Sequence, residues 1–429
     1  MSTTLSLPSL AQTQQNVCKK FETVVLNFGE SVRYSPAWPV LDRAYRADQH
    51  APFDLHPERI EAVLSLTEEW KDRPALIVYG RSGENAGVAV LIPKNVSTKK
   101  IPGFGIHCTL KGHRLAGNAF LGAGQTPEFR AALLREVLLQ LEKQASQNLL
   151  IEDLDVTSSL WHTVHANVPG SWSDFFPQGL QPRHRLQFPL PDRNQYWSKF
   201  STKTKSTFRR NIKRLGNFEV KRFTEPSQVP DFLEDAHRIS LETWQTQQLG
   251  LRVKNDRREL DLFSSAAILE GFRSYILYQD AQPIAFIIGL QSHGTFLTSE
   301  LGFDQKFARF SPGQVLLLKI LEDLIEHQPP TTLDFGFGDA GYKSIFGTHV
   351  SSSADVWLMP RTLKSSAIRG WGQAARAFVK TSKKIVQKTG FAATLKKALR
   401  QAYRLRSNGA KMPGDEAGTS PSDDRTAND

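Results

Sequence analysis

Residues 331–343 read Thr331-Thr332-Leu333-Asp334-Phe335-Gly336-Phe337-Gly338-Asp339-Ala340-Gly341-Tyr342-Lys343. The first of them are typical of a short strand, and charges, glycines, a phenol and an amine follow it closely. Upstream, Phe310-Ser311-Pro312-Gly313-Gln314 leads into the apolar run 315–321, which predicts a loop that opens directly into a helix. We expect these two segments to form one site.

The apolar residues around these segments predict a mixed order of helices and strands. In the second half of the chain they predict a helix over 230–248, a hairpin of strands 274–278 and 283–290, a strand over 295–303, a helix over 313–327 and a strand over 332–335. In the first half they predict a helix over 58–70, a hairpin of strands 75–80 and 87–93, a helix over 127–144 and a strand over 148–154. The shared order predicts an α/β fold with a mixed (α+β) sheet, built from two similar domains.

Length and charge divide the chain further. Its 429 residues suggest about two domains, and prolines near 186–193 predict the joint between them. The net charge is +11, but the segment 361–407 alone holds 13 Lys or Arg and no Asp or Glu. We expect a polar leader at 1–19, domains at 20–190 and 191–360, a basic amphipathic helical extension at 361–407 and a disordered acidic tail at 408–429.

Several common kinds of binding site are excluded, because the sequence lacks residues that they require. The segment Gly336–Gly341 fits G-x-G-x-x-G, but a dinucleotide site also needs a long helix and an acidic residue further on, and the sequence offers neither. Only Cys18 and Cys108 occur, and the histidines lack zinc-site spacing, so no metal site is predicted. The polar N-terminus and the lack of a long apolar run predict a cytoplasmic protein, with peripheral membrane contact as a further option.

Several sequence motifs, taken together, make the chain similar to a known family. They are the basic helix Lys203-Thr204-Lys205-Ser206-Thr207-Phe208-Arg209-Arg210-Asn211-Ile212-Lys213-Arg214-Leu215, Trp244, the strand 283–286, Gly302-Phe303-Asp304, Ser311-Pro312-Gly313, Asp334-Phe335, Gly338-Asp339 and Tyr342-Lys343. Over about 20–358 the chain is similar to tandem acetyltransferase-like proteins of the GNAT superfamily, the group called CelD or BioF2-like, which is related to the Fem peptidyltransferases. The resemblance implies tandem GNAT-like domains.

The resemblance also implies a cosubstrate. In that superfamily acyl-CoA lies between two splayed strands, and backbone amides at the start of the next helix hold its pyrophosphate. Ser311, Gly313, Gln314 and Val315 are the matching positions, and a helix start with free amides suits an anion. The alternative is an ordinary helix start that packs Val315 in the core.

We expect the first domain to lack this cosubstrate site. Gly122-Ala123-Gly124-Gln125 precedes the corresponding helix there, but Thr126-Pro127-Glu128 follows, and the carboxylate of Glu128 would repel a pyrophosphate.

Catalysis in the superfamily is direct attack on a thioester, so a base and an acid are needed rather than a nucleophilic side chain. Glu300 is the candidate base and Tyr342 the candidate acid, although Glu300 could be a solvated strand residue and Tyr342 could only fill a groove. Substrate contacts are expected from the basic helix, from Trp244 and from the glycine-rich segment. These candidates are Lys203, Arg210, Lys213, Trp244, Asp334, Gly338, Asp339 and Lys343.

Each group of substrate candidates also has a purely structural explanation. The basic residues could be a solvated helix face, and Trp244 could be a core residue. Asp334 and Asp339 could form caps or ion pairs with Lys343 and the basic helix, which is the favoured interpretation for these two acids.

The sequence therefore predicts an acyltransferase that moves an acyl group from acyl-CoA to an amine or hydroxyl of a sugar or cell-envelope polysaccharide precursor. Two alternatives remain. One is a Fem-like peptidyltransferase that uses aminoacyl-tRNA, with 361–407 contacting RNA phosphates. The other is a non-catalytic polysaccharide-biosynthesis protein that docks on anionic membrane through the same segment.

Overall fold

A computed structural model describes residues 20–82, 85–97, 109–122, 125–144, 148–188, 193–243, 246, 253–338 and 340–374. The chain divides into two compact units, Met1–Arg369 and Gly370–Asp429, and the description below concerns the first. Trp244, Asp339, the leader, the tail and the extension beyond 374 lie outside the described residues. The extension begins with helical residues at 363–374, and the rest of it stays a prediction.

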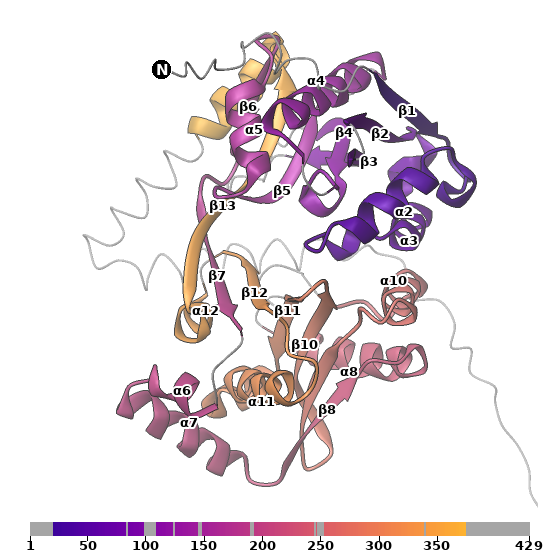
Figure 1. Cartoon of the computed structure of the whole chain (residues 1–429). Coiled ribbons are helices and arrows are strands. Elements are labelled where there is room, and N and C mark those ends of the chain that lie inside the picture. Colours follow the sequence, from indigo (N-terminus) through magenta and orange to yellow (C-terminus); the bar gives the residue numbers. More distant parts are fainter. Residues whose placement is uncertain are drawn as a thin grey trace, which may run out of the picture. The chain divides into compact units, whose positions relative to one another are not determined.

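One mixed sheet runs through the described part of the first unit, which confirms the expected α/β class (Figure 1). Its hydrogen-bonded order is β1-β2-β3-β4-β5-β13-β7-β12-β11-β10-β9-β8, and β6 pairs with β13. The strands are β1 Phe21–Leu26, β2 Ala75–Ser82, β3 Asn85–Ser97, β4 Thr109–Leu115, β5 Leu149–Asp155, β6 Trp172–Phe175, β7 Gln181–Gln187, β8 Phe218–Phe223, β9 Ser274–Gln279, β10 Gln282–Ser292, β11 Thr295–Phe303, β12 Thr332–Phe337 and β13 His349–Pro360.

The same order of elements occurs twice. The strands β2, β3 and β4 are antiparallel neighbours, the helix α4 (Pro127–Lys143) follows, and β5 then pairs parallel to β4. In the second half β9, β10 and β11 are antiparallel, α11 (Pro312–Glu326) follows, and β12 pairs parallel to β11. The repeated order predicted from the apolar pattern is therefore present in the structure.

Helices cover both faces of the sheet in each half. The helices are α2 Trp38–Ala47, α3 Pro57–Ser65, α5 Ser159–Asn167, α6 Arg193–Ser198, α7 Thr202–Leu215, α8 Val229–Leu241, α10 Arg257–Ile268 and α12 Gly341–Phe346, besides α4 and α11. In the first half α2 and α3 pack on one face and α4 and α5 on the other. In the second half α11, α6 and α7 share one core, and α8 and α10 share the core of the opposite face.

Two strands cross the expected domain boundary. β7 belongs to the first half by sequence, yet it pairs with β12 of the second half from Gln187↔Thr332 to Arg183↔Phe337. β13 belongs to the second half, yet it pairs with β5 and β6 of the first half. β7 and β13 also pair with each other, so the sheet is continuous between the halves.

Some element bounds differ from the expected ones. The helix predicted over 58–70 is α3, which ends at Ser65, followed by a short 3-10 helix η4 at Glu68–Lys71. The helix predicted over 230–248 ends at Leu241, because the backbone leaves helical geometry at Glu242. A short helix, α12, follows the glycine-rich stretch, although the sequence there suggested none.

Candidate functional site

β11 and β12 separate after a short contact. They pair in parallel at Thr295↔Thr332, Phe296↔Leu333 and Leu297↔Asp334, and among the described residues their pairing ends there. β11 then continues to Phe303 beside β10, and β12 continues to Phe337 beside β7. The two strands therefore follow different neighbours beyond Leu297, which is the arrangement that the GNAT resemblance implies for a cosubstrate.

A β-bulge in β11 lies directly beyond this point. Ile288 of β10 pairs with Glu300, but Gly289 pairs with Thr298, so Ser299 is the extra residue. Side chains before the bulge alternate, and Phe296 packs in the α11 core whereas Leu297 and Ser299 line a cavity beside α10.

Because Leu301 and Phe303 pack with the α11 core, Glu300 faces α10 as well. The carboxyl of Glu300 accordingly acts electrostatically on Glu259 of α10. The bulge thus puts two consecutive side chains, Ser299 and Glu300, on one face.

The start of α11 lies beside β11. Ser311 has a left-handed backbone, with φ 52° and ψ 52°, and its side chain makes no capping hydrogen bond. A Cβ built on the buried Gly313 would come within 3.0 Å of Leu301 Cδ2, so the glycine allows the helix to approach the strand closely.

The amides at this helix start are only partly available, which corrects one expectation. The Ser311 carbonyl accepts hydrogen bonds from the amides of Gln314 at 3.0 Å and Val315 at 3.2 Å. Pro312 has no amide hydrogen, so the first turn keeps the Gly313 amide alone for an outside acceptor. Val315 is fully buried.

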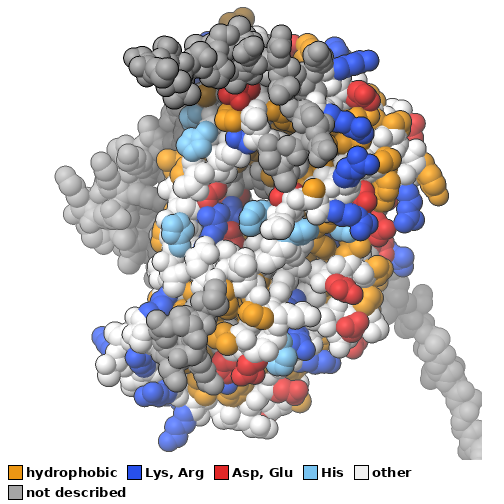
Figure 2. Space-filling model, viewed as in Figure 1, with side chains coloured by type: hydrophobic (Ala, Val, Ile, Leu, Met, Phe, Trp, Pro, Cys, Tyr) orange, Lys and Arg blue, Asp and Glu red, His pale blue; other side chains and the backbone are white. Residues whose placement is uncertain are grey.

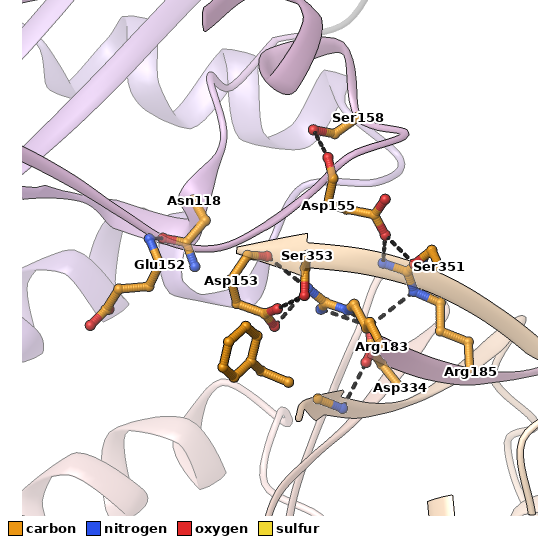
Figure 3. A network of polar contacts seen from close by, with 12 residues as sticks. Asn118, Glu152, Asp153, Asp155, Ser158, Arg183, Arg185, Asp334, Ser351 and Ser353 are labelled. Carbon is orange, nitrogen blue, oxygen red and sulfur yellow. Dashed lines mark hydrogen bonds and ion pairs between the residues drawn. The ribbon is translucent and has the colours of Figure 1, made fainter. Parts of the chain in front are cut away.

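A network of buried and partly buried ions ties β12 to the first half (Figure 3). Asp334 is 4% exposed, and its Oδ2 accepts from Arg183 at 2.7 Å and from Arg185 at 3.1 Å. Arg183 also pairs with Asp153 of β5 at 2.7 Å, and Arg185 pairs with Asp155 at 2.7 Å. Each arginine therefore bridges β12 and β5.

Hydroxyl groups of β13 complete the network. The Ser351 hydroxyl donates to Asp155 at 2.7 Å, and the Ser353 hydroxyl donates to Asp153. Burial opposes ionisation of Asp155, but hydrogen bonds from Thr157 and Ser351 and the charge of Arg185 outweigh it and lower the pKa of Asp155 to about 2. Burial is likewise outweighed at Asp334, where the two arginines lower the pKa of the carboxyl.

These contacts settle the partners of Asp334. An ion pair was the favoured interpretation, and the partners are the arginines of β7 rather than Lys343 or the basic helix. The Lys343 ammonium instead donates to the carbonyls of Phe337 at 2.9 Å and Gly336 at 3.2 Å, and the Gly338 amide donates to Pro182 at 3.2 Å. The glycine-rich stretch is therefore held by polar contacts at both of its ends.

The two candidate catalytic residues face opposite sides of the sheet. Burial raises the pKa of the Glu300 carboxyl, which faces α10. Tyr342 packs against the α11 core, with its ring edge-on to Phe335 at 6.3 Å between centroids. Burial raises the pKa of the Tyr342 phenol to about 12, so this phenol is protonated at neutral pH.

The basic residues of α7 lie on its surface. Phe208, Asn211 and Leu215 face the core, whereas Lys203, Arg210 and Lys213 are exposed. Figure 2 shows Lys and Arg side chains gathered where Figure 1 places α7, at the lower left.

Sequence comparison identifies the family of this region. Residues 202–344 match the family model described as an acetyltransferase (GNAT) domain. Residues 202–344 are a GNAT acetyltransferase domain. The GNAT domain includes α7, the β11 bulge, the start of α11 and the glycine-rich stretch, which confirms the resemblance to the GNAT superfamily and the enzyme class expected for this half.

Other comparisons give distant likenesses. No curated protein matches the sequence. Similar solved structures include a conserved protein of unknown function from Bacteroides thetaiotaomicron VPI-5482, at 13% identity over 79% of this chain and 100% of that chain with a TM-score of 0.48. FemX is 14% identical over 67% of this chain and 88% of that chain, with a TM-score of 0.48. L-PGS from Bacillus licheniformis is 12% identical over 82% of this chain and 98% of that chain, with a TM-score of 0.45.

Sequence reasoning missed the ion network around the GNAT domain. The signals were present in Gln181-Pro182-Arg183-His184-Arg185-Leu186-Gln187, where arginines alternate along a strand, and in the acids of Glu152-Asp153-Leu154-Asp155 inside an apolar strand. Acids and arginines that the apolar pattern places within one sheet need partners of opposite charge, so the two patterns together indicate an ion network, which here spans β5 and β7 across the intervening β13.

Two kinds of feature are absent from the described residues. No helix there is long and apolar enough to cross a membrane. No group of three or more His, Cys, Asp or Glu there is arranged to hold a metal ion.

Proposed function

We propose that the protein transfers an acyl group from acyl-CoA to an amine or hydroxyl of a sugar or cell-envelope polysaccharide precursor. The observation that supports this best is the end of β11–β12 pairing beside the start of α11, inside a GNAT domain. A strand pair that separates leaves backbone groups without a sheet partner, and a thioester donor with amides in its arm can occupy them.

The residues on the α11 side fit such a donor. The Thr298 hydroxyl is buried and makes no hydrogen bond within the described residues, so a donor amide at this point would supply its partner. The Gly313 amide, the Ser311 hydroxyl and the Gln314 side chain then contact the pyrophosphate. Val315 contributes packing alone, because its amide already pairs with Ser311.

The acceptor approaches from the α10 side in this proposal. Its nitrogen or oxygen attacks the thioester carbonyl, a C–N or C–O bond forms, and the C–S bond breaks. Glu300 takes the proton of the acceptor, and Tyr342 gives a proton to the leaving thiolate on the opposite face. A buried carboxyl with a raised pKa is a stronger base than an exposed one, and a protonated phenol is a suitable acid.

The remaining candidates have positioning and docking roles. Asp334, Gly338 and Lys343 hold the end of β12 through the contacts described above. The exposed ammonium and guanidinium groups of Lys203, Arg210 and Lys213 can contact phosphates or acidic sugars of the substrate.

Calorimetric titration with acetyl-CoA tests the donor. We expect binding to the native protein and a loss of about 100-fold or more in the Gly313→Glu variant, because the added side chain crowds Leu301 at the start of α11 and brings a carboxylate to the pyrophosphate. Glu128→Gln, in the first turn of α4, is the matched control and should bind as the native protein does. The donor assignment fails if the native protein does not bind or if Gly313→Glu binds equally well.

A further inference from the structure

A cavity of about 330 Å³ lies on the α10 side of the GNAT domain. Elements of both halves line it, including α3, the edge of β3 and β4 in the first half and α10 and β11 in the second. Four of its lining side chains are cationic, namely Arg59, Lys94, Arg114 and Arg258, and two are carboxylates, Asp54 and Glu69. The cavity wall therefore has an excess of positive charge.

Arg59 is the most deeply buried of these cations. Its side chain is 4% exposed, and its Nε has no hydrogen-bond partner in the described structure. The Nη1 group donates to the Ser265 hydroxyl at 2.7 Å and to the Leu262 carbonyl, both neutral acceptors. The nearest carboxylate, Asp54, is 3.8 Å away and is itself 45% exposed. A buried guanidinium with so little compensation is costly unless an anion accompanies it.

The neighbouring charges of the cavity, on Arg114 and Glu69, do not neutralise the positive charge of Arg59. Arg114 is mostly buried, and its closest acid, Glu152, lies at 3.8 Å, beyond hydrogen-bond distance. Arg114 also repels Arg59 electrostatically. The carboxylate of Glu69 already accepts from the amide of Asn95 at 3.2 Å.

The cavity reaches the reacting end of the proposed site. Its wall includes Leu297, the last β11 residue paired with β12, and Ser299, the bulged residue next to Glu300. A molecule held at the arginines would therefore present its other end to the face on which the candidate base lies.

We propose that this cavity binds an oxyanion of the acceptor, a phosphate or a carboxylate, through Arg59, Arg114 and Arg258. This inference rests on the proposed function, since it names the chemical class of the acceptor. Guanidinium groups bind either oxyanion through paired N–H donors, which also orients the rest of the molecule. The volume exceeds what a lone oxyanion needs, so part of the attached group enters the cavity too.

The test uses inorganic phosphate and acetate as probes, titrated calorimetrically at equal ionic strength into the full chain. We expect one of the two to bind at one site, and its identity distinguishes a phosphate from a carboxylate acceptor. The double variant Arg114→Gln/Arg258→Gln should weaken that binding by about tenfold or more. Arg257→Gln is the matched control, because Arg257 neighbours Arg258 on α10 but is 85% exposed and pairs with Asp261.

Acetyl-CoA titration of the same variants separates this inference from the proposed function. We expect the double variant to bind acetyl-CoA as tightly as the native protein does. The inference is overturned if neither probe binds, if Arg257→Gln loses as much affinity as the double variant, or if the double variant loses acetyl-CoA instead. A native protein that binds phosphate but no acetyl-CoA would overturn the proposed function and leave the anion site standing.

Discussion

The starts of α4 and α11 occupy the same place in the two halves but differ in what they offer a ligand. Both begin with a hydroxyl residue and a proline, Thr126-Pro127 and Ser311-Pro312. The Thr126 hydroxyl accepts from the Phe129 amide at 3.2 Å, and Glu128 adds a negative charge to the first turn. At α11 the Ser311 side chain makes no cap, the first turn has no acid, and Gly313 replaces the glutamate.

The strands before these two helices also differ, in how far each continues beyond its pairing with the next parallel strand. β4 pairs with β5 at Arg114↔Leu150 and ends one residue later, at Leu115. β11 continues past Leu297 to Phe303 after its pairing with β12 has ended. A helix start without an acid and a separated strand pair occur together only in the second half of the described structure, so the donor site proposed for that half depends on a few local differences within a shared order of elements.

The largest expected effect is on turnover, at Glu300. In Glu300→Gln we expect the rate of acyl transfer to fall by about 100-fold or more, since a general base contributes that much. Burial raises the pKa of Glu300, so the native rate should rise with pH through that raised pKa as the carboxylate forms. The variant should lose this rise. Glu219→Gln, exposed on β8, is the control, and an unchanged pH–rate profile in Glu300→Gln would remove Glu300 as the base.

The next effect concerns the network that ties β12 to the first half. Asp334→Asn should lower the free energy of unfolding by about 3 kcal/mol, because it removes two ion pairs of a buried carboxylate and leaves two partly buried arginines with one negative charge fewer beside them. Asp261→Asn, in an exposed pair on α10, should change it by about 0.5 kcal/mol or less. Denaturant unfolding measures both variants, and equal effects would mean that the network contributes no more than a surface pair.

Acid should weaken the same network. The pKa of Asp155 is lowered to about 2 in the folded state, below its usual value, so its contribution is complete above the unfolded pKa and is lost as pH falls toward 2. Unfolding measured from pH 6 down to pH 2 should show a steeper loss in the native protein than in Asp155→Asn. A parallel pair of curves would contradict the role given to Asp155.

The smallest effect separates the two helix starts directly. Thr126→Ala should cost about 1 kcal/mol of unfolding free energy, because it removes a side-chain cap. Ser311→Ala should cost about 0.5 kcal/mol or less, since no capping bond is lost. Similar costs at both positions would show that the two starts are capped alike in solution.

The apolar pattern was enough to predict most strands and helices of the two repeats, because β10, β11, α4 and α11 have long, regular apolar faces, but it did not predict β4. It missed β7 and β13, whose polar residues are buried by ion pairs and hydroxyl contacts that form only between distant segments. Gly313 and Glu300 could be chosen from sequence by resemblance. The bulge that turns Glu300 toward α10 could not, because it depends on a register shift opposite β10.

Hydrogen–deuterium exchange with and without acetyl-CoA tests the asymmetry between the halves most directly. We predict that acetyl-CoA slows exchange at residues 311–316, at the start of α11, and leaves residues 126–131, at the start of α4, unchanged. Protection at 126–131, or an unchanged rate at 311–316 in a protein that binds acetyl-CoA, would contradict the assignment of the donor site to the second half.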